Sequence, residues 1–321
     1  MSNREPVFPQ TASNPSRDDE IDLHELFAIL WQGKWIIVAT TFLFAAAGVA
    51  YALYKPNIYK ASVLLAPAQD EGAAGGISGQ LGGLASLAGI NVGGGGANKT
   101  MMAKQILQSR AFLADFIHRH NLSVPLMASE AWDIQKEQWL LNTEVYDSQA
   151  GQWLADEDGE SQKPTDWDLV KVFRENHLSV SEDKETGMIT LNVKSLSPQA
   201  AKAWAELLVN DINEHMQMQD VREAEARIAY LETKLNETNI AGMQQVFYQL
   251  IESETRTVML ANAQDEYIFK TVDPAVVPQE KSEPKRALIA IVATMLGGML
   301  GVFAVFVRAF IRIGKQEKGT L

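Results

Sequence analysis

Two long uncharged apolar segments constrain the fold of this chain more than any other feature of its sequence. Trp35 to Tyr54 spans 20 residues and Ala287 to Val307 spans 21, and neither segment contains a charged side chain. A helix needs about 20 apolar residues to cross the hydrocarbon core of a bilayer. A surface helix of a soluble protein would instead have a polar face. The pattern therefore predicts membrane-spanning helices over residues 35–54 and 287–307.

The residues around the first apolar segment favour a retained anchor over a cleaved signal peptide. Signal peptides begin with a short basic region and have an apolar core of about 7–15 residues. Here the apolar core is longer, and the 34 residues before it are acidic. Trp31 and Trp35 at one end, and Tyr51 and Tyr54 at the other, are typical of the two lipid–water interfaces.

Two spans place both termini on the same side of the membrane. The Lys and Arg residues near the spans hardly discriminate the orientation, because six lie on the terminal side and five on the loop side. Long loops, however, cross a membrane largely regardless of their charge. We therefore expect residues 1–34 and 308–321 to be cytoplasmic, and residues 55–286 to form a large periplasmic domain.

The net charge of −12 comes mainly from the segment between the spans, where 33 Asp and Glu residues outnumber 21 Lys and Arg residues. Nucleic-acid phosphates are bound by Lys and Arg, so this acidity argues against a nucleic-acid partner. The chain also has no cysteine, which excludes disulfides, thiolate metal sites and a cysteine nucleophile.

Small residues recur every four positions in the second apolar segment, at Ala293, Gly297 and Gly301. Gly48 and Ala52 form a weaker set of the same kind in the first segment. Small residues on one helix face let two helices approach closely in lipid. This face is expected to pack on the other span or on a partner, although glycine is also simply frequent in membrane helices.

The segment between the spans mixes strand and helix patterns, which predicts an α+β domain. Alternating apolar residues predict strands, and apolar residues at helical spacing predict helices. The strands are expected at 59–65, 178–181, 187–194 and 267–272, and shorter helices at 101–120 and 170–177.

A long helix is expected over residues 198–235. Ser197 is a favoured N-cap and Pro198 a favoured first helical residue. At about 1.5 Å per residue the helix would be roughly 57 Å long, which suggests a protruding arm. Two separate helices in a compact domain remain the alternative. The apolar positions of the predicted long helix follow coiled-coil-like spacing. They form a candidate seam for a homo-oligomer: Trp204, Leu208, Ile212, Val221, Ile228, Leu231 and Leu235. A break over 236–242 and a second helix from Met243 follow.

A proline-rich connector over residues 273–286 leads into the second span. It contains Pro274, Pro278 and Pro284, followed by Lys285. Proline fixes φ and removes a backbone donor, so the connector is expected to be stiff and extended. These residues would then fix how the domain sits on the membrane.

No catalytic, cofactor or metal site is expected. The glycine-rich stretch from Gly72 to Gly96, interpreted as a loop with a short helix near 81–88, lacks the Gly-Lys-Ser/Thr ending of a phosphate-binding loop. Of the five histidines only His118 and His120 are close in sequence, and two residues apart on a helix they face away from each other. No Gly-x-Ser-x-Gly sequence occurs. We therefore predict that the chain is not an enzyme.

Three stretches resemble the Wzz family of O-antigen chain-length determinants, the class 1 polysaccharide co-polymerases. They are Asp19–Val38 (DEIDLHELFAILWQGKWIIV), Leu81–Asn91 (LGGLASLAGIN) and residues 272–289 (VDPAVVPQEKSEPKRALI). The resemblance implies a bacterial inner-membrane protein with an α/β base domain and a long helix rising from it. It also implies a ring or bell of identical protomers. Such proteins modulate a separate membrane polymerase that joins lipid-linked O-antigen repeats, and they set the polymer length without making bonds.

Other functions remain open from the sequence. The closest alternative is a co-polymerase for capsule, exopolysaccharide or enterobacterial common antigen. A periplasmic sensor would need a signalling module, for which residues 1–34 and 308–321 leave no room. An export adaptor would usually have one span and a lipoyl-like strand repeat, and neither is found in the sequence.

Overall fold

The computed structural model describes residues 30–68 and 95–317. The chain forms two compact units, one made of Met1–Lys55 with Lys285–Leu321 and the other of Pro56–Pro284. The short helix expected near 81–88, and the resembling stretch 81–91, lie outside the described residues, as does the first part of the stretch at 19–38.

The first unit is a pair of long apolar helices, α2 (Lys34–Tyr54) and α10 (Arg286–Glu317), which pack along each other. Lys34–Tyr54 and Arg286–Ile311 are long and apolar enough to cross a membrane, and only 6% and 17% of their apolar windows are buried. Helix α10 continues past Val307, where the predicted span ended. A membrane span must end where charged residues begin, but a helix can continue through them. Arg and Lys, which follow there, are good helix formers.

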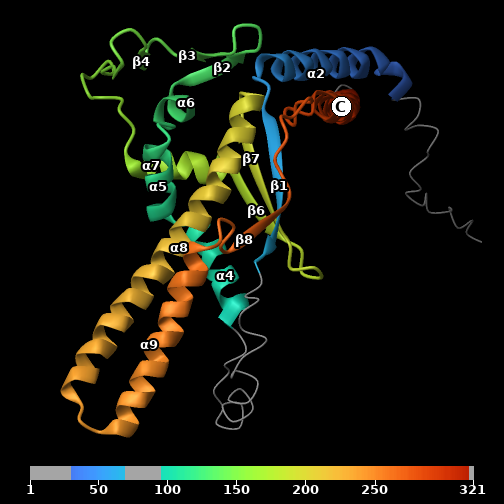
Figure 1. Ribbon diagram of the computed structural model, residues 1–321. Coiled ribbons are helices and arrows are strands. Elements are labelled where there is room, and N and C mark those ends of the chain that lie inside the picture. The colour runs from blue at the N-terminus through green and yellow to red at the C-terminus, as the bar shows by residue number, and fades with distance from the viewer. Residues whose placement is uncertain (1–29, 69–94, 318–321) are drawn as a thin grey trace, which may run out of the picture. The chain divides into compact units, whose positions relative to one another are not determined.

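The second unit is built on a four-stranded antiparallel sheet of order β6-β7-β1-β8 (Figure 1). Its strands are β1 (Tyr59–Pro67), β6 (Leu178–Glu182), β7 (Ile189–Ser195) and β8 (Phe269–Asp273). Alternate residues of β1 and β7 are buried, as the two-residue period of a strand requires: Ala61, Val63 and Leu65 in β1, and Ile189, Leu191 and Val193 in β7. The predicted mixture of sheet and helix is confirmed.

Helices pack on the buried side of this sheet to form one apolar core. They are α4 (Gly95–Leu107), α5 (Arg110–Arg119), α6 (Ser123–Met127), α7 (Asp166–Val172), the π-helix η2 (Phe173–His177) and the first half of α8. The single helix expected over 101–120 is in fact two helices. Ser109 separates them, because its side chain caps α5 by accepting a hydrogen bond from the Phe112 amide at 3.3 Å.

Residues 128–162 form two small β-hairpins where the sequence shows no clear period. The hairpins pair β2 (Ser129–Asp133) with β3 (Gln138–Leu141), and β4 (Tyr146–Asp147) with β5 (Gln152–Trp153). Aspartates make the turns: the Asp133 carboxylate accepts from the amides of Gln135 and Lys136. Strands this short have too few alternating apolar and polar residues to be recognised in the sequence. The aspartates at their ends, however, are a local signal for turns.

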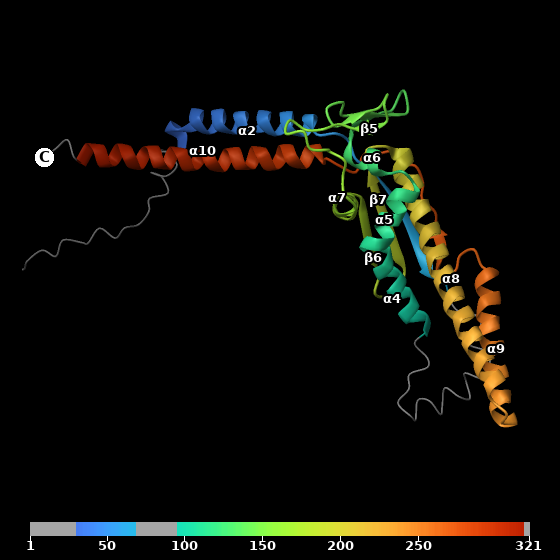
Figure 2. The same ribbon diagram turned by 90° about the vertical axis from the view of Figure 1, so that its left-hand side faces the viewer.

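A long helical hairpin extends from the base, made of α8 (Pro198–Glu237) and α9 (Ala241–Asn262) (Figure 2). Ser197 caps α8 by accepting from the Ala200 amide at 3.2 Å. The last fully buried side chain of α8 is Ala224, and α9 is the main neighbour of α8 in the contacts among the described residues. We call residues 221–260, the outer parts of α8 and α9 with the turn between them, the arm. The predicted long protruding helix is therefore confirmed, at 40 residues.

Candidate functional site

Glycines let α2 and α10 approach each other closely. A Cβ built on Gly297 would lie 2.7 Å from the Phe44 Cβ and 3.0 Å from the Thr41 Cα. A Cβ on Gly301 would lie 2.9 Å from the Ile37 Cα and would also overlap the Thr40 hydroxyl. At these two positions no side chain fits without moving the neighbouring helix.

The same contact continues along both helices. Ala293 lies against Gly48, where a second Cβ would overlap the one that Ala293 already has, and Gly33 lies against Val305. Near the other end, the Arg286 side chain donates to the Ala52 carbonyl at 3.1 Å. The small face formed by Ala293, Gly297 and Gly301 is thus occupied by the chain's own α2, so in this structure it is not available to a second protein.

The outward faces of these helices are apolar. Trp35 and Phe42 of α2 are 76% and 74% exposed, and Met299 and Phe303 of α10 are 69% and 67% exposed. Burying such surfaces in an apolar medium is favourable in proportion to their area. The pair is therefore consistent with membrane anchoring.

The proline-rich connector is held to the base of the second unit by backbone and side-chain contacts. The Ile58 amide donates to the Glu283 carbonyl at 2.9 Å, and the Ser282 amide donates to the Ile58 carbonyl at 2.8 Å. Lys194 on β7 pairs with the Glu283 carboxylate at 2.5 Å. Where the connector leaves the unit, it is therefore tied to the start of β1, which is where the chain enters the unit.

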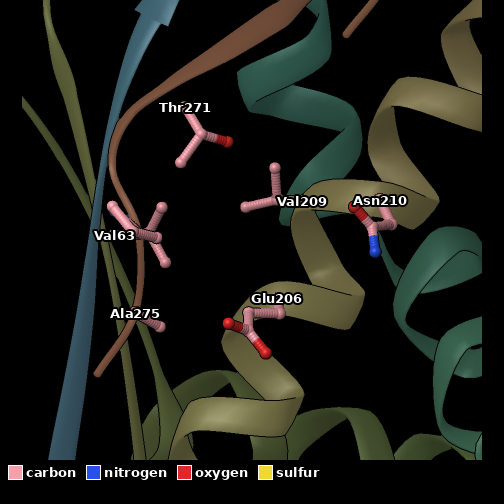
Figure 3. A pocket seen from close by; sticks show the side chains of 7 residues that line it. Val63, Glu206, Val209, Asn210, Thr271 and Ala275 are labelled. Carbon is pink, nitrogen blue, oxygen red and sulfur yellow. The ribbon is translucent and has the colours of Figure 1, made fainter. Parts of the chain in front are cut away.

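The prolines themselves differ in their surroundings. Pro274 and Lys285 are exposed, whereas Pro278 and Pro284 are half-buried. Pro274 borders an open cavity of about 280 Å³ between α8, β1 and β8 (Figure 3). Its walls are Val63, Glu206, Val209, Asn210, Thr271 and Ala275.

The lining of this cavity is mostly uncharged. Glu206 is the only titratable residue among those lining it, and its carboxylate already lies 3.5 Å from the Lys202 amine. Glu206, Asn210 and Thr271 offer an acceptor, an amide and a hydroxyl above an aliphatic wall, as Figure 3 shows. General acid–base chemistry needs a positioned acid and base together; among the described residues that line the cavity, Glu206 has no titratable neighbour, and Lys202 lies beside it outside the lining.

The predicted seam of α8 is divided between two environments. Trp204, Leu208 and Ile212 are 5%, 0% and 0% exposed and belong to the chain's own core. The other four, Val221, Ile228, Leu231 and Leu235, are partly buried in the arm, where α8 meets α9. The sequence pattern thus marks residues that are placed against the same chain, and it did not reveal which surface of the arm stays open.

Three polar residues of α8 form a ladder at the root of the arm that the sequence reasoning missed. Asn213, which is 3% exposed, accepts from the amides of Ile268 and Phe269 at 2.9 Å each and donates to the Phe269 carbonyl at 3.0 Å. Gln217 donates to the Ala261 carbonyl at 2.6 Å. These bonds tie the end of α9 and the start of β8 to α8.

The third member, Asp220, joins two further segments at the same level. Its carboxylate accepts from the Lys99 amine at 2.8 Å and from the Tyr267 hydroxyl at 2.5 Å. Asn213, Gln217 and Asp220 recur at spacings of four and three, beside the apolar stripe that Ile212 and Met216 belong to. Polar residues at helical spacing next to a buried stripe were the signal for this ladder.

Several titratable groups of the base are paired with one another. His120 lies 2.9 Å from the Asp211 carboxylate, and Arg119 pairs with Asp115 and Glu214 at 2.7 and 3.1 Å. Burial lowers the pKa of His177; the bond from its Nδ1 to the Lys194 carbonyl, 2.7 Å long, offsets this only in part. Within residues 30–68 and 95–317, no group of three or more His, Asp or Glu side chains could hold a metal ion.

Two family models match the sequence, one towards each end. The Wzz model, described as "Chain length determinant protein", matches residues 19–120. The GNVR model, described as "G-rich domain on putative tyrosine kinase", matches residues 237–310. No protein of curated function matches the chain significantly in sequence.

Solved structures of similar proteins include one described as "full-length bacterial polysaccharide co-polymerase". It is 13% identical with a TM-score of 0.37, and the match covers 91% of this chain and 98% of that one. A fragment of WzzB, a polysaccharide co-polymerase from Salmonella Typhimurium, is 10% identical with a TM-score of 0.30, covering 71% and 100%. TM-scores of this size do not establish that the folds are the same. The similarity to known families therefore rests on the Wzz and GNVR sequence models.

Proposed function

We propose that this chain, which belongs to the Wzz family of chain length determinant proteins, regulates the length distribution of lipopolysaccharide O-antigen. The family is one of polysaccharide co-polymerases. The observation that supports the proposal best is that the two matched ends of the sequence meet twice in the structure. Helix α2 packs on α10, and strand β1 pairs with β8. Each of the two sequence matches therefore contributes one helix to the apolar helix pair and one strand to the sheet of the folded domain.

In the proposed arrangement the chain crosses the bacterial inner membrane twice. Residues 35–54 and 287–307 are the spans, residues 1–34 and 308–321 lie in the cytoplasm, and residues 55–286 form the periplasmic co-polymerase domain. The apolar exterior of α2 and α10 supports the spans. The tie between Ile58 and Glu283 supports a single membrane-proximal root for the periplasmic domain, because each residue lies close in sequence to a span.

The protein acts, in this proposal, without catalysing a reaction. It forms a homo-oligomer, engages a separate O-antigen polymerase, and holds the lipid-linked polysaccharide near that polymerase until a length-dependent release. The stiff connector with Pro274, Pro278, Pro284 and Lys285 sets the position of the domain on the membrane. Paired charges in the base, and a cavity with a single titratable residue, support a scaffold better than an active site.

Deletion of the gene followed by complementation tests the proposal. The readout is the lipopolysaccharide ladder on a silver-stained gel. The expected result is that deletion turns a cluster of long chains into a smoothly decaying distribution, and that the gene restores the cluster. An unchanged ladder would refute the O-antigen role, and a changed capsule or exopolysaccharide in the same strain would then assign the chain to that polymer.

A further inference from the structure

The two small β-hairpins are built from one sequence pattern that occurs twice in a row. Residues 130–142 (EAWDIQKEQWLLN) and residues 144–156 (EVYDSQAGQWLAD) are identical at six of thirteen aligned positions. The shared residues are, in order, one Glu, one Asp, two Gln, one Trp and one Leu. Each strand is too short to show an apolar period, and the repeat appears only when the two segments are aligned.

The fold explains why the aspartate recurs. The Asp133 carboxylate accepts from two amides of the first turn at 2.9 and 3.1 Å, and the Asp147 carboxylate accepts from two amides of the second at 2.8 and 3.0 Å. The backbone then takes a positive φ at equivalent positions, 50° at Glu137 and 68° at Gly151. The two segments therefore form turns of the same kind, which their aspartates stabilise.

The fold also explains why the tryptophan recurs. The ring centroid of Trp139 lies 4.9 Å from that of its cross-strand partner Trp132, and the centroid of Trp153 lies 5.2 Å from that of Tyr146. Both pairs meet edge to face, an arrangement that aromatic rings prefer. Trp139 also stacks on Trp204 of α8, which holds the first hairpin on the core. These aromatic residues therefore stabilise the hairpins themselves.

The fold gives no such role to the four recurring glutamines. Gln135 and Gln149 follow their aspartates by two residues, and Gln138 and Gln152 directly precede their tryptophans. All four are exposed, and none of their side chains forms a hydrogen bond with another described residue. A side chain without a contact in its own chain does not stabilise the fold, so its recurrence favours a contact with another molecule.

Each pair of glutamines lies beside the recurring leucine. Successive residues of a strand point to opposite faces, so Gln138 and Leu140 share the face of β3 that is turned away from the aromatic contact. Leu140 is 45% exposed. Gln152 and Leu154 hold the equivalent positions in the second hairpin, where Leu154 is half-buried. We call these two groups the glutamine sites: Gln135, Gln138 and Leu140 in the first, and Gln149, Gln152 and Leu154 in the second.

A glutamine site has the chemistry of a carbohydrate contact. A glutamine amide both donates and accepts hydrogen bonds, as a sugar hydroxyl does, and it carries no charge that would have to be desolvated. The leucine side chain offers an apolar surface to the C–H groups of a sugar ring, and burying such groups is favourable. Each site thus offers both kinds of contact that a sugar makes.

The charge of the surrounding segment restricts the ligand further. Residues 129–163 contain nine Asp and Glu residues but only two Lys residues and no Arg. Like charges repel, so an anionic lipid surface or an acidic sugar fits this segment poorly. Uncharged sugars fit it, because they meet the amides through hydrogen bonds alone.

From the recurring glutamines we infer that the two hairpins are equivalent subsites for uncharged sugars of a polysaccharide chain. A polymer of repeat units presents the same hydroxyl groups at regular intervals, so a duplicated site matches a repeating ligand. Two linked contacts also bind one molecule more tightly than either contact alone. The inference rests on the proposed function, in which the chain holds a polysaccharide, and it assigns that contact to named residues.

The position of the hairpins agrees with this ligand. Trp204, on which the first hairpin packs, lies within two turns of the start of α8. That start follows Ser195, the β7 partner of Tyr59 at the beginning of β1. Figure 1 shows both hairpins at this end of the second unit, where the chain enters it from the first apolar helix. In the proposed topology this is the membrane end, where a lipid-linked polysaccharide begins.

Equilibrium binding to the detergent-solubilised full chain tests the inference. The probe is O polysaccharide released from lipid A by mild acid, and the readout is isothermal titration calorimetry. Gln135→Ala with Gln138→Ala removes the first site, and Gln149→Ala with Gln152→Ala removes the second. Either pair of changes should weaken binding by about tenfold or more, because two hydrogen bonds are lost. All four changes together should abolish binding.

The matched control is Lys136→Ala with Ser148→Ala. Both residues are exposed in the same two turns, at positions that the repeat does not share, so the affinity should stay unchanged. No binding by the unchanged chain, or full binding by the variant with all four changes, would overturn the inference. An equal loss of affinity in the control would overturn it as well.

Trypsin cleavage after Lys136 distinguishes a polysaccharide from a lipid surface as the occupant. The Lys136 side chain is 69% exposed in the turn of the first hairpin. Added polysaccharide should slow this cleavage in detergent. Reconstitution into vesicles of phosphatidylethanolamine and phosphatidylglycerol, without polysaccharide, should leave its rate unchanged. Protection by the vesicles alone would assign the hairpins to the membrane and refute the sugar subsites.

These measurements separate the inference from the proposed function, because binding is read without a polymerase and without length control. Binding that is lost when all four glutamines are changed, together with an unchanged lipopolysaccharide ladder on gene deletion, would keep the sites and refute the O-antigen role. A changed ladder on deletion, together with no binding by the unchanged chain, would keep the role and refute the sites.

Discussion

Asn213 illustrates at the residue scale how α8 holds the base and the arm together. The side chain is 3% exposed and uses both its acceptor and its donor on the backbone of Ile268 and Phe269. An apolar residue of the same size would leave two amides and a carbonyl without their partner. Leaving a buried polar group unsatisfied costs about 1–3 kcal/mol.

Asn213→Ala should therefore lower the free energy of unfolding by about 1–3 kcal/mol. The measurement is denaturant unfolding of the detergent-solubilised chain, followed by tryptophan fluorescence. Asn210→Ala is the control, because Asn210 is exposed one turn earlier on the same helix. Equal stability of the two variants would show that the ladder does not hold the root of the arm.

His177 makes a second prediction at this scale, about pH. Burial lowers its pKa in the folded chain below the ordinary value of 6.5, so the unfolded chain binds more protons between the two values. Its contribution to stability is therefore complete above pH 6.5 and is lost as pH falls through the folded pKa. His177→Gln should make the unfolding free energy less dependent on pH below 6.5. His118→Gln is the control, because the His118 side chain is 55% exposed; the same response from both variants would contradict the assignment.

At the scale of elements, the contact between α2 and α10 depends on the absence of side chains at Gly297 and Gly301. Leucine at both positions would have to push the helices apart, because even a Cβ comes within 2.7 and 2.9 Å of α2. Overpacking of this kind typically costs about 1–3 kcal/mol per site. The helices would then separate while the rest of the chain stays folded.

We accordingly expect Gly297→Leu with Gly301→Leu to abolish length control while the loop domain stays folded. The readouts are the lipopolysaccharide ladder and protease resistance of the periplasmic domain. Gly298→Leu should be tolerated, since a Cβ there lies 3.7 Å from the Thr41 hydroxyl, an ordinary contact. Unchanged banding in the double variant would show that length control does not depend on the paired helices.

A helix or strand can be predicted from the sequence only where capping residues or a regular apolar spacing mark it. The long helix could be predicted because Ser197 and Pro198 mark its start and its apolar stripe continues for many turns. The two hairpins between Ser129 and Trp153 were missed, because strands of two to five residues show no period and only the aspartates at their turns mark them. The break at Ser109 was missed because an apolar stripe continues across it.

The candidate site shows the same limit. Spacing alone identified Ala293, Gly297 and Gly301 as a small face, but only the structure shows that α2 covers it. The apolar spacing of α8 likewise marked Trp204 and Leu231 together, although one lies in the core and the other in the arm. A repeat reports that a helix side is apolar, and tertiary contacts decide which neighbour covers it.

At the scale of the whole molecule, segments from the two ends of the sequence lie next to each other in both units. Residues 19–120 and 237–310 match two different family models; helix α2 of the first packs on α10 of the second, and strand β1 of the first pairs with β8 of the second. The segment between them supplies β6, β7 and the first half of α8 to the same core. A regulator built in this way offers a fixed anchor, a folded base and an arm, and its function is proposed to depend on holding other molecules rather than on converting them.

The most direct test of this central claim is to measure the total amount of O-antigen and its length distribution together, in the deletion strain and its parent. The measurement is the number of repeat units per lipid A, with the full distribution of chain lengths. If the chain regulates length without making bonds, deletion leaves long polymers present and changes their distribution from a cluster to a smooth decay. If deletion instead leaves only lipid A with a single repeat, the chain is needed for polymerisation itself, which contradicts a role limited to regulating length.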